Sequence, residues 1–147
     1  MANHLPAITV LSVSPSRRDH EYLASILGQS VWRLFCVSSC AEAWKLLHQT
    51  PVSVILTERS FPGGLGWRDL LEEVSAMQVA PPVVVTTRGA DEALWKDVLE
   101  AGAFDLLTKP LDPDEVRRVI SLSWRSARDA RTLKASCRPR ALVSAAT

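Results

Sequence analysis

The chain has 147 residues, of which 47% are hydrophobic, and a formal net charge of +1. That length suits one domain with its own core, and the near-neutral balance excludes a protein drawn to nucleic acid or membranes by overall charge alone. No apolar run approaches the ~20 residues of a membrane span, and residues 1–6 lack the build of a signal peptide. Three cysteines without metal-site spacing favour a reduced, cytoplasmic protein.

Five short runs rich in apolar and β-branched residues predict strands. They lie at residues 8–13, 31–37, 52–57, 83–86 and 104–107. Between and after them, apolar residues recur at helical spacing and predict five helices. These helices include residues 22–27, 41–47, 70–77, 93–99 and 116–124. The alternation predicts an α/β fold, a doubly wound, five-stranded parallel sheet with helices on both faces.

Polar residues at the ends of the predicted strands form the candidate site. In a parallel sheet the carboxyl ends of the strands meet at one edge, where ligands collect. Ser14, Glu58, Thr86, Thr87 and Lys109 each end or follow a strand. The segment around Glu58 is the most informative, because a buried strand there delivers a carboxylate to a glycine-rich turn.

Beyond about residue 130 the helical pattern fades. Residues 125–147 carry six basic residues and one acid, Asp129, so the rest of the chain is net acidic. We predict a folded domain at residues 7–126, followed by a basic helix extension and flexible tail at residues 127–147. No aromatic residues are interleaved with the basic ones of the tail, so we do not expect it to bind nucleic acid.

Three segments, in order along the chain, resemble the receiver domain of bacterial two-component response regulators. Residues 54–58, followed by Pro62-Gly63, are similar to the family's phosphoacceptor strand and loop. Residues 82–87 resemble the strand that bears its switch hydroxyl. Residues 100–110, an Ala-Gly-Ala run leading to a lysine and a proline, are the most specific piece. The resemblance covers about residues 8–126 and implies the flavodoxin-like strand order 2-1-3-4-5.

The family's chemistry depends on five groups. Two acids after the first strand and a phosphoacceptor aspartate hold Mg²⁺, while a hydroxyl and a lysine hold the phosphoryl oxygens. The resemblance places Thr86 at the hydroxyl position, with Thr87 as the alternative, and Lys109 at the lysine position. It also implies a cis peptide bond before Pro110, since X-Pro bonds tolerate that geometry at low cost.

The acids are where this sequence departs from the family. Ser14 and Pro15 fall where the acidic pair belongs, Glu58 takes the phosphoacceptor position, and Leu106 stands where the family usually has an aromatic switch residue. We therefore expect the magnesium site to be lost. What remains is a lone acid, Glu58, in charge-assisted contact with a lone amine, Lys109.

Plainer interpretations of the same residues stay open. Glu58 is also compatible with a solvated acid at a loop mouth, and Lys109 with a structural lysine that only neutralises it. Whether Glu58 mimics a phosphorylated residue is open as well, because a carboxylate has one charge and two oxygens whereas an acyl phosphate has nearly two charges and three. We expect no catalytic residue, no bound metal and no other cofactor.

The function expected from these features is signal transduction by protein contact, through an atypical receiver that is not phosphorylated and is not an enzyme. The resemblance implies an output face on the fourth helix, fifth strand and fifth helix. Its residues include Trp95, Asp97, Asp105 and Arg117 or Arg118. The partner is expected to be a histidine kinase, an effector or a second copy of the chain. The alternatives are a working phosphoacceptor in a phosphorelay and a small-ligand sensor that uses the vacated pocket.

Overall fold

The computed structural model describes residues 8–28, 32–89 and 91–146, with side chains described as far as residue 130. Within these residues, strands and helices alternate along the whole chain. Their bounds are β1 Thr9–Val13, α1 Arg17–Leu27, β2 Arg33–Val37, α2 Cys40–Gln49, β3 Val54–Glu58, α3 Trp67–Ser75, β4 Val83–Thr87, α4 Glu92–Glu100, β5 Asp105–Thr108 and α5 Pro113–Ala146. The predicted strand and helix order is therefore present.

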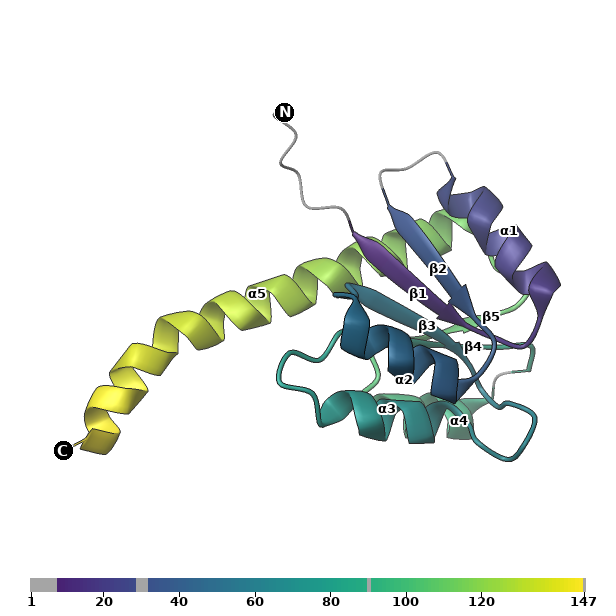
Figure 1. Ribbon diagram of the computed structural model, residues 1–147. Helices are drawn as coiled ribbons and strands as arrows, with labels where there is room; N and C mark the ends of the chain where they lie inside the picture. The colour runs from purple at the N-terminus through teal and green to yellow at the C-terminus, as the bar shows by residue number, and fades with distance from the viewer. Residues whose placement is uncertain (1–7, 29–31, 90, 147) are drawn as a thin grey trace.

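The strands form one sheet in the order β2-β1-β3-β4-β5, and every pair is parallel (Figure 1). This confirms the predicted fold class and strand order. Because all strands run in the same direction, Val13, Glu58, Thr87 and Thr108 end at the same edge of the sheet. That edge collects the polar residues that the sequence singles out.

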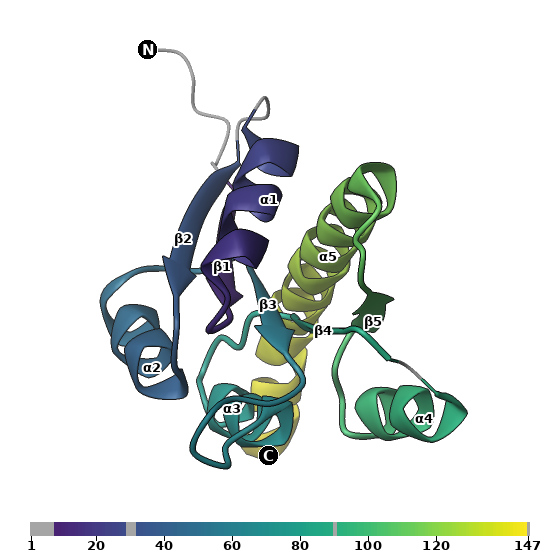
Figure 2. The ribbon, with the colours of Figure 1, turned by 90° about the vertical axis from the view of Figure 1, so that its right-hand side faces the viewer.

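Helices cover both faces of the sheet, with α1 and α5 on one face and α2, α3 and α4 on the other (Figure 2). Side chains of the central strands alternate between the two layers. Val10 and Val54 belong to the core beneath α1 and α5, whereas Leu11 and Ile55 belong to the core on the other face. All four are completely buried, which explains why these strands are continuous apolar runs.

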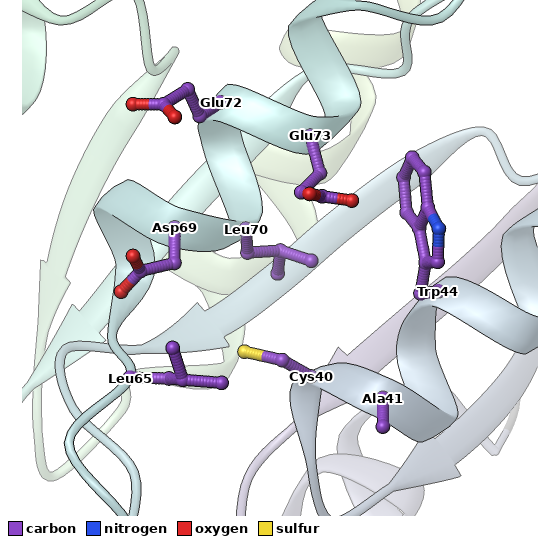
Figure 3. A pocket seen from close by; sticks show the side chains of 8 residues that line it. All are labelled: Cys40, Ala41, Trp44, Leu65, Asp69, Leu70, Glu72 and Glu73. Carbon is purple, nitrogen blue, oxygen red and sulfur yellow. The ribbon is translucent and has the colours of Figure 1, made fainter.

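A surface groove separates α2 from α3 (Figure 3). Cys40 and Trp44 of α2, Leu65 of the β3–α3 loop and Leu70 of α3 supply its apolar lining, and its volume is about 300 Å³. The groove therefore lies on the side of the sheet opposite α5.

Helix α5 is longer than the sequence pattern predicts. Beyond about residue 130, where the apolar pattern fades, α5 continues to Ala146 and has 34 residues in all. Alanine, leucine, arginine and lysine supply ten of residues 131–146 and favour helix. Pro139 is the exception, since proline lacks the backbone N–H of one helical hydrogen bond. Loss of apolar periodicity reports the lack of a buried face rather than the end of a helix. The division at residues 126 and 127 stays a prediction. Of the helices described, none combines the length and apolar character needed to cross a membrane.

Candidate functional site

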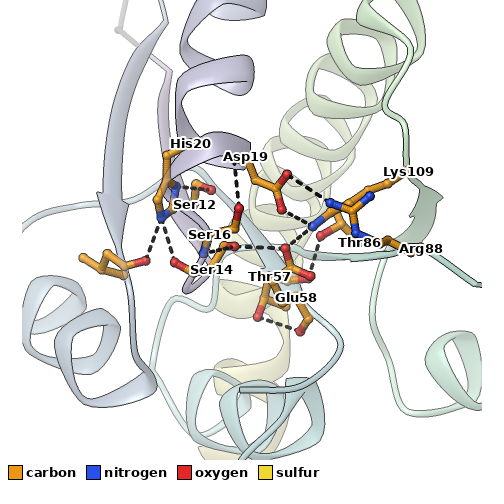
Figure 4. A network of polar contacts seen from close by, with 11 residues as sticks. Ser12, Ser14, Ser16, Asp19, His20, Thr57, Glu58, Thr86, Arg88 and Lys109 are labelled. Carbon is orange, nitrogen blue, oxygen red and sulfur yellow. Dashed lines mark hydrogen bonds and ion pairs between the residues drawn. The ribbon is translucent and has the colours of Figure 1, made fainter. Parts of the chain in front are cut away.

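A compact polar network occupies the carboxyl edge of the sheet (Figure 4). Glu58 ends β3 directly opposite Thr86 of β4, and Ser14 follows β1. Lys109 follows β5, and its backbone N–H donates to the carbonyl of Thr87 at 2.8 Å. The parallel register therefore brings together four residues that are distant in the sequence.

Glu58 and Lys109 form the centre of this network. The Nζ of Lys109 donates to Oε2 of Glu58, and the same oxygen accepts a hydrogen bond from the Oγ of Ser14 at 2.9 Å. The side chains of Lys109 and Glu58 are only 7% and 16% exposed. Glu58 is thus a largely buried, doubly hydrogen-bonded carboxylate rather than a solvated acid at a loop mouth.

Asp19 is a second acid in the site, and the expectation of a lone acid beside a lone amine is wrong. Its Oδ2 lies 2.5 Å from the Nζ of Lys109, so one ammonium contacts two carboxylates. The exposed Arg88 adds a longer contact, 3.9 Å from Nη2 to Oδ1 of Asp19. Burial raises the pKa of Asp19, but the contacts with Lys109 and the charge of Arg88 outweigh it and hold the pKa below its ordinary value.

The start of α1 explains how Asp19 reaches the site. Ser16 is the N-cap of α1, and its Oγ accepts from the backbone N–H of Asp19 at 3.2 Å. An acid in the first helical turn is also favoured by the helix dipole. The sequence pattern predicts Glu58 as the acid of this site and does not indicate Asp19. A Ser-x-x-Asp cap immediately after the first strand is the signal that could have indicated it.

A neutral hydroxyl follows the end of β1. Ser14 is buried; besides donating to Glu58, its Oγ accepts from the N–H of Ser16 at 3.1 Å. Pro15 is exposed and supplies neither a charge nor a backbone donor. The β1–α1 loop therefore contributes the neutral hydroxyl of Ser14 to the network.

His20 holds this loop from behind. Its Nε2 lies 2.8 Å from the carbonyl of Ser14 and 3.1 Å from the carbonyl of Val37, and its Nδ1 lies 3.1 Å from the Oγ of Ser12. Carbonyl oxygens only accept, so Nε2 carries a hydrogen. The backbone N–H of Ser14 also donates to Val37, at 3.0 Å. The ring thereby ties the β1–α1 loop to the end of β2, a role that the sequence did not indicate.

The remaining predicted residues lie around this centre. Thr86 lines the small cavity beside Glu58, and its Oγ1 donates to the carbonyl of Thr57 at 3.3 Å. The hydroxyl of Thr87 instead lies 3.4 Å from the carbonyl of Gly89. Leu106 is buried in the core on the α2–α3–α4 face. The peptide bond between Lys109 and Pro110 is cis, as expected.

The cavity at this edge is very small. Its volume is about 20 Å³, and its walls include Ser14, Asp19, Glu58, Thr86 and Lys109. This is room for about one water molecule, whereas small-molecule sites are roughly 300–1,000 Å³. The arrangement is closed to a ligand the size of a nucleotide.

The donor set does not fit a magnesium ion as it is arranged. Mg²⁺ requires oxygen ligands in a near-octahedral shell. Here the two available carboxylates, Asp19 and Glu58, both contact the ammonium of Lys109. In the part of the chain that the structure describes, no three His, Cys, Asp or Glu residues come together in a way that holds a metal.

The fold and this edge define a signalling class of protein. Residues 10–121 match the family model described as "Response regulator receiver domain". The match spans most of the chain, so the protein belongs to the response regulator receiver family. It is a receiver domain of two-component signalling.

Sequence relatives agree with that assignment, and a solved structure shares the fold. Two-component response regulator ORR11 of Oryza sativa subsp. indica is 34% identical over 115 residues, which cover 76% of this chain and 78% of the rice protein. ORR5 of Oryza sativa subsp. japonica is 33% identical over 115 residues, covering 76% and 85%. The signal receiver domain of an HD domain-containing protein from Pseudomonas fluorescens Pf-5 superposes with a TM-score of 0.79 at 17% identity, covering 90% of this chain and 97% of that one. This last likeness shows the shared fold.

Proposed function

We propose that this receiver domain transmits signals by protein contact alone, without phosphorylation and without Mg²⁺. The observation that carries the proposal is the ammonium of Lys109, which contacts both Glu58 and Asp19. The protein's own cation thus neutralises the carboxylates that a metal ion would need. Receiver domains are signalling domains rather than enzymes, and we propose no catalytic residue here.

Phosphoryl transfer to this pocket meets two obstacles. The transferring group carries charge that a metal ion normally neutralises, and the position of the acidic pair holds Ser14 and Pro15. The carboxylate oxygen of Glu58 that faces the site is already bonded to Ser14 and Lys109. Attack by that oxygen requires both contacts to be broken first. We propose that Glu58 instead holds the pocket in one constitutive state.

The proposed output face comprises α4, β5 and α5. Receiver domains interact with partner proteins such as kinases and effectors. On this face Trp95 and Leu99, one turn apart on α4, are 44% and 41% exposed, and Leu122 of α5 is 46% exposed. Exposed aromatic and aliphatic side chains of this kind mark contact surfaces. Asp97, also on α4, lies 3.5 Å from Arg68 of α3, which orients its charge toward the neighbouring helix.

Treatment with a small phosphodonor tests the proposal. The protein is incubated with acetyl phosphate and Mg²⁺, and its intact mass is recorded. We expect the mass to stay unchanged, and millimolar Mg²⁺ to leave the unfolding temperature unchanged, since a ligand that binds only the folded state raises stability. The matched variant Ser14→Asp/Pro15→Asp/Glu58→Asp restores the family's acids and is expected to gain a magnesium-dependent rise in unfolding temperature.

The rival function is a working phosphoacceptor receiver, which the family membership favours. It requires the unmodified chain to gain one phosphoryl group under these conditions. That result overturns our proposal, whichever residue carries the group. The third function considered, a small-ligand sensor at this edge, receives no support from a cavity of about 20 Å³.

A further inference from the structure

The groove between α2 and α3 has an apolar floor and an acidic rim. Trp44 and Leu65 leave part of their apolar surface uncovered, and Leu65 is 48% exposed. Three carboxylates stand along α3 at Asp69, Glu72 and Glu73 (Figure 3). Their spacing of three and four residues places them on one side of the helix. No basic residue is among those that line the groove.

The rim charges are not neutralised within the described residues. Glu72 and Glu73 are exposed and make no ion pair there. Asp69 accepts a hydrogen bond from the backbone N–H of Gly66 at 2.8 Å, which leaves its charge uncompensated. Burial, followed by the charges of Asp69 and Glu73, raises the pKa of the Cys40 thiol. The negative field of α3 therefore reaches the floor of the groove.

The complementary charge lies in the same chain. Residues 125–147 carry six basic residues and one acid, and α5 is helical to Ala146. Four of the six basic residues, Arg131, Lys134, Arg138 and Arg140, lie beyond residue 130. The part of α5 beyond residue 126 is about 30 Å long at 1.5 Å per residue, comparable with the domain itself.

This basic helix does not cover the groove of its own chain. Helix α5 lies on the opposite face of the sheet from α2 and α3, and its end leads away from both (Figure 1). The chain itself provides a segment of the right charge to fill the groove, which is the basic end of α5 from a second copy. Two chains related by a two-fold axis place each basic helix in the other's groove and leave neither groove open.

We propose that the C-terminal part of α5 docks into the α2–α3 groove of a second copy, forming a reciprocal dimer held by opposite charges over an apolar floor. This surface is separate from the α4–β5–α5 face proposed for output. The dimer is the function of the extension.

Sedimentation of the full chain tests the dimer. We expect a salt-sensitive dimer whose dissociation constant rises at least about tenfold between about 0.05 M and about 0.5 M salt, because screening weakens contacts between exposed charges. The variant E72K/E73K is expected to sediment as a monomer under conditions where the unmodified chain is dimeric. The control E21K/D114K makes the same change in net charge at exposed acids of α1 and α5 and is expected to remain dimeric.

A charge exchange identifies the contact directly. The variant K134E/R138E is also expected to be monomeric alone. An equal mixture of E72K/E73K and K134E/R138E is expected to recover a dimer, because each helix then meets a groove of opposite charge. Alkylation of Cys40 is expected to slow relative to that of the exposed Cys36 as protein concentration rises through the dimerisation range.

Three outcomes overturn the proposal. A monomer at every concentration and salt level excludes the dimer. A dimer insensitive to E72K/E73K, but lost on substitution of Trp95 and Leu99, assigns association to the output face instead. Binding of duplex DNA by the monomer, abolished in K134E/R138E and unaccompanied by dimerisation, assigns the basic helix to nucleic acid.

Discussion

Lys109 and Asp19 are ninety residues apart in the sequence and form an ion pair of 2.5 Å at the carboxyl edge of the sheet. Glu58 contacts the same ammonium from the other side. One largely buried cation therefore balances two acids supplied by α1 and β3. The stability of the site and its response to pH both depend on this shared amine.

Removing the ammonium is expected to destabilise the domain strongly. Lys109→Met keeps most of the apolar stem but leaves Asp19 and Glu58 without their common partner. Breaking a buried charge pair in this way costs about 3 kcal/mol of the free energy of unfolding, measurable by urea denaturation. Lys96→Met, at a side chain 74% exposed in a surface pair with Glu100, is the control and should cost about 0.5 kcal/mol or less. Similar losses for the two variants would contradict the shared-amine arrangement.

The lowered pKa of Asp19 predicts a loss of stability in acid. When the folded-state pKa of a carboxyl lies below the unfolded value, its contribution is complete above the unfolded pKa, about 4, and is lost as pH falls through the folded pKa. The free energy of unfolding should therefore fall more steeply below about pH 4 in the unmodified protein than in Asp19→Asn. Glu42, whose pKa is lowered by the backbone N–H and hydroxyl of Ser38, is common to both proteins and cancels in the comparison. Parallel curves would argue against a charged Asp19 in the native site.

Loss of the His20 ring is expected to loosen the β1–α1 loop. His20→Ala removes the side-chain donor of the Ser14 carbonyl, whereas the Val37 carbonyl keeps the N–H of Ser14. An unsatisfied buried group costs about 1–3 kcal/mol. Hydrogen exchange at the Ser14 amide should accelerate as well, because its bond to Val37 depends on the same loop position. The control is His48→Ala on α2. The His48 ring is exposed and packs edge-on against Trp44, with 4.6 Å between the ring centroids. It should leave the Ser14 amide protected.

Deleting the end of α5 is expected to leave the domain folded. Among the described side chains of α5, the buried ones are Val116, Val119, Ile120 and Ser123. A chain that ends at residue 130 retains all of them. At a protein concentration and salt level where the full chain is monomeric, it should unfold within about 0.5 kcal/mol of the full chain, as for surface changes in general. Circular dichroism and urea denaturation check this expectation. A much larger loss would show that residues 127–147 belong to the fold, against the predicted division of the chain.

The local patterns were sufficient for the architecture. Continuous apolar runs in β1, β3 and β4 indicate strands that are buried on both faces. Such a run is a pattern of consecutive residues and can therefore be recognised in the sequence. The run of residues 100–110 likewise carries its family signal within one short segment. Glu58, Thr86 and Lys109 were therefore found from sequence, because a parallel sheet brings its strand ends to one edge whatever the side chains in between.

Contacts between distant segments could not be read in the same way. Asp19, capped by Ser16 at the start of α1, meets Lys109 only in the folded chain, and His20 reaches its two carbonyls only once β1 and β2 are paired. Apolar periodicity also did not indicate the end of α5, since it reports a buried face rather than helical backbone as such. Local sequence patterns therefore specified the strands and the candidate residues. The packing of α1 against the sheet decided which charges meet, because the separation between charges on distant segments is set only when the whole domain folds.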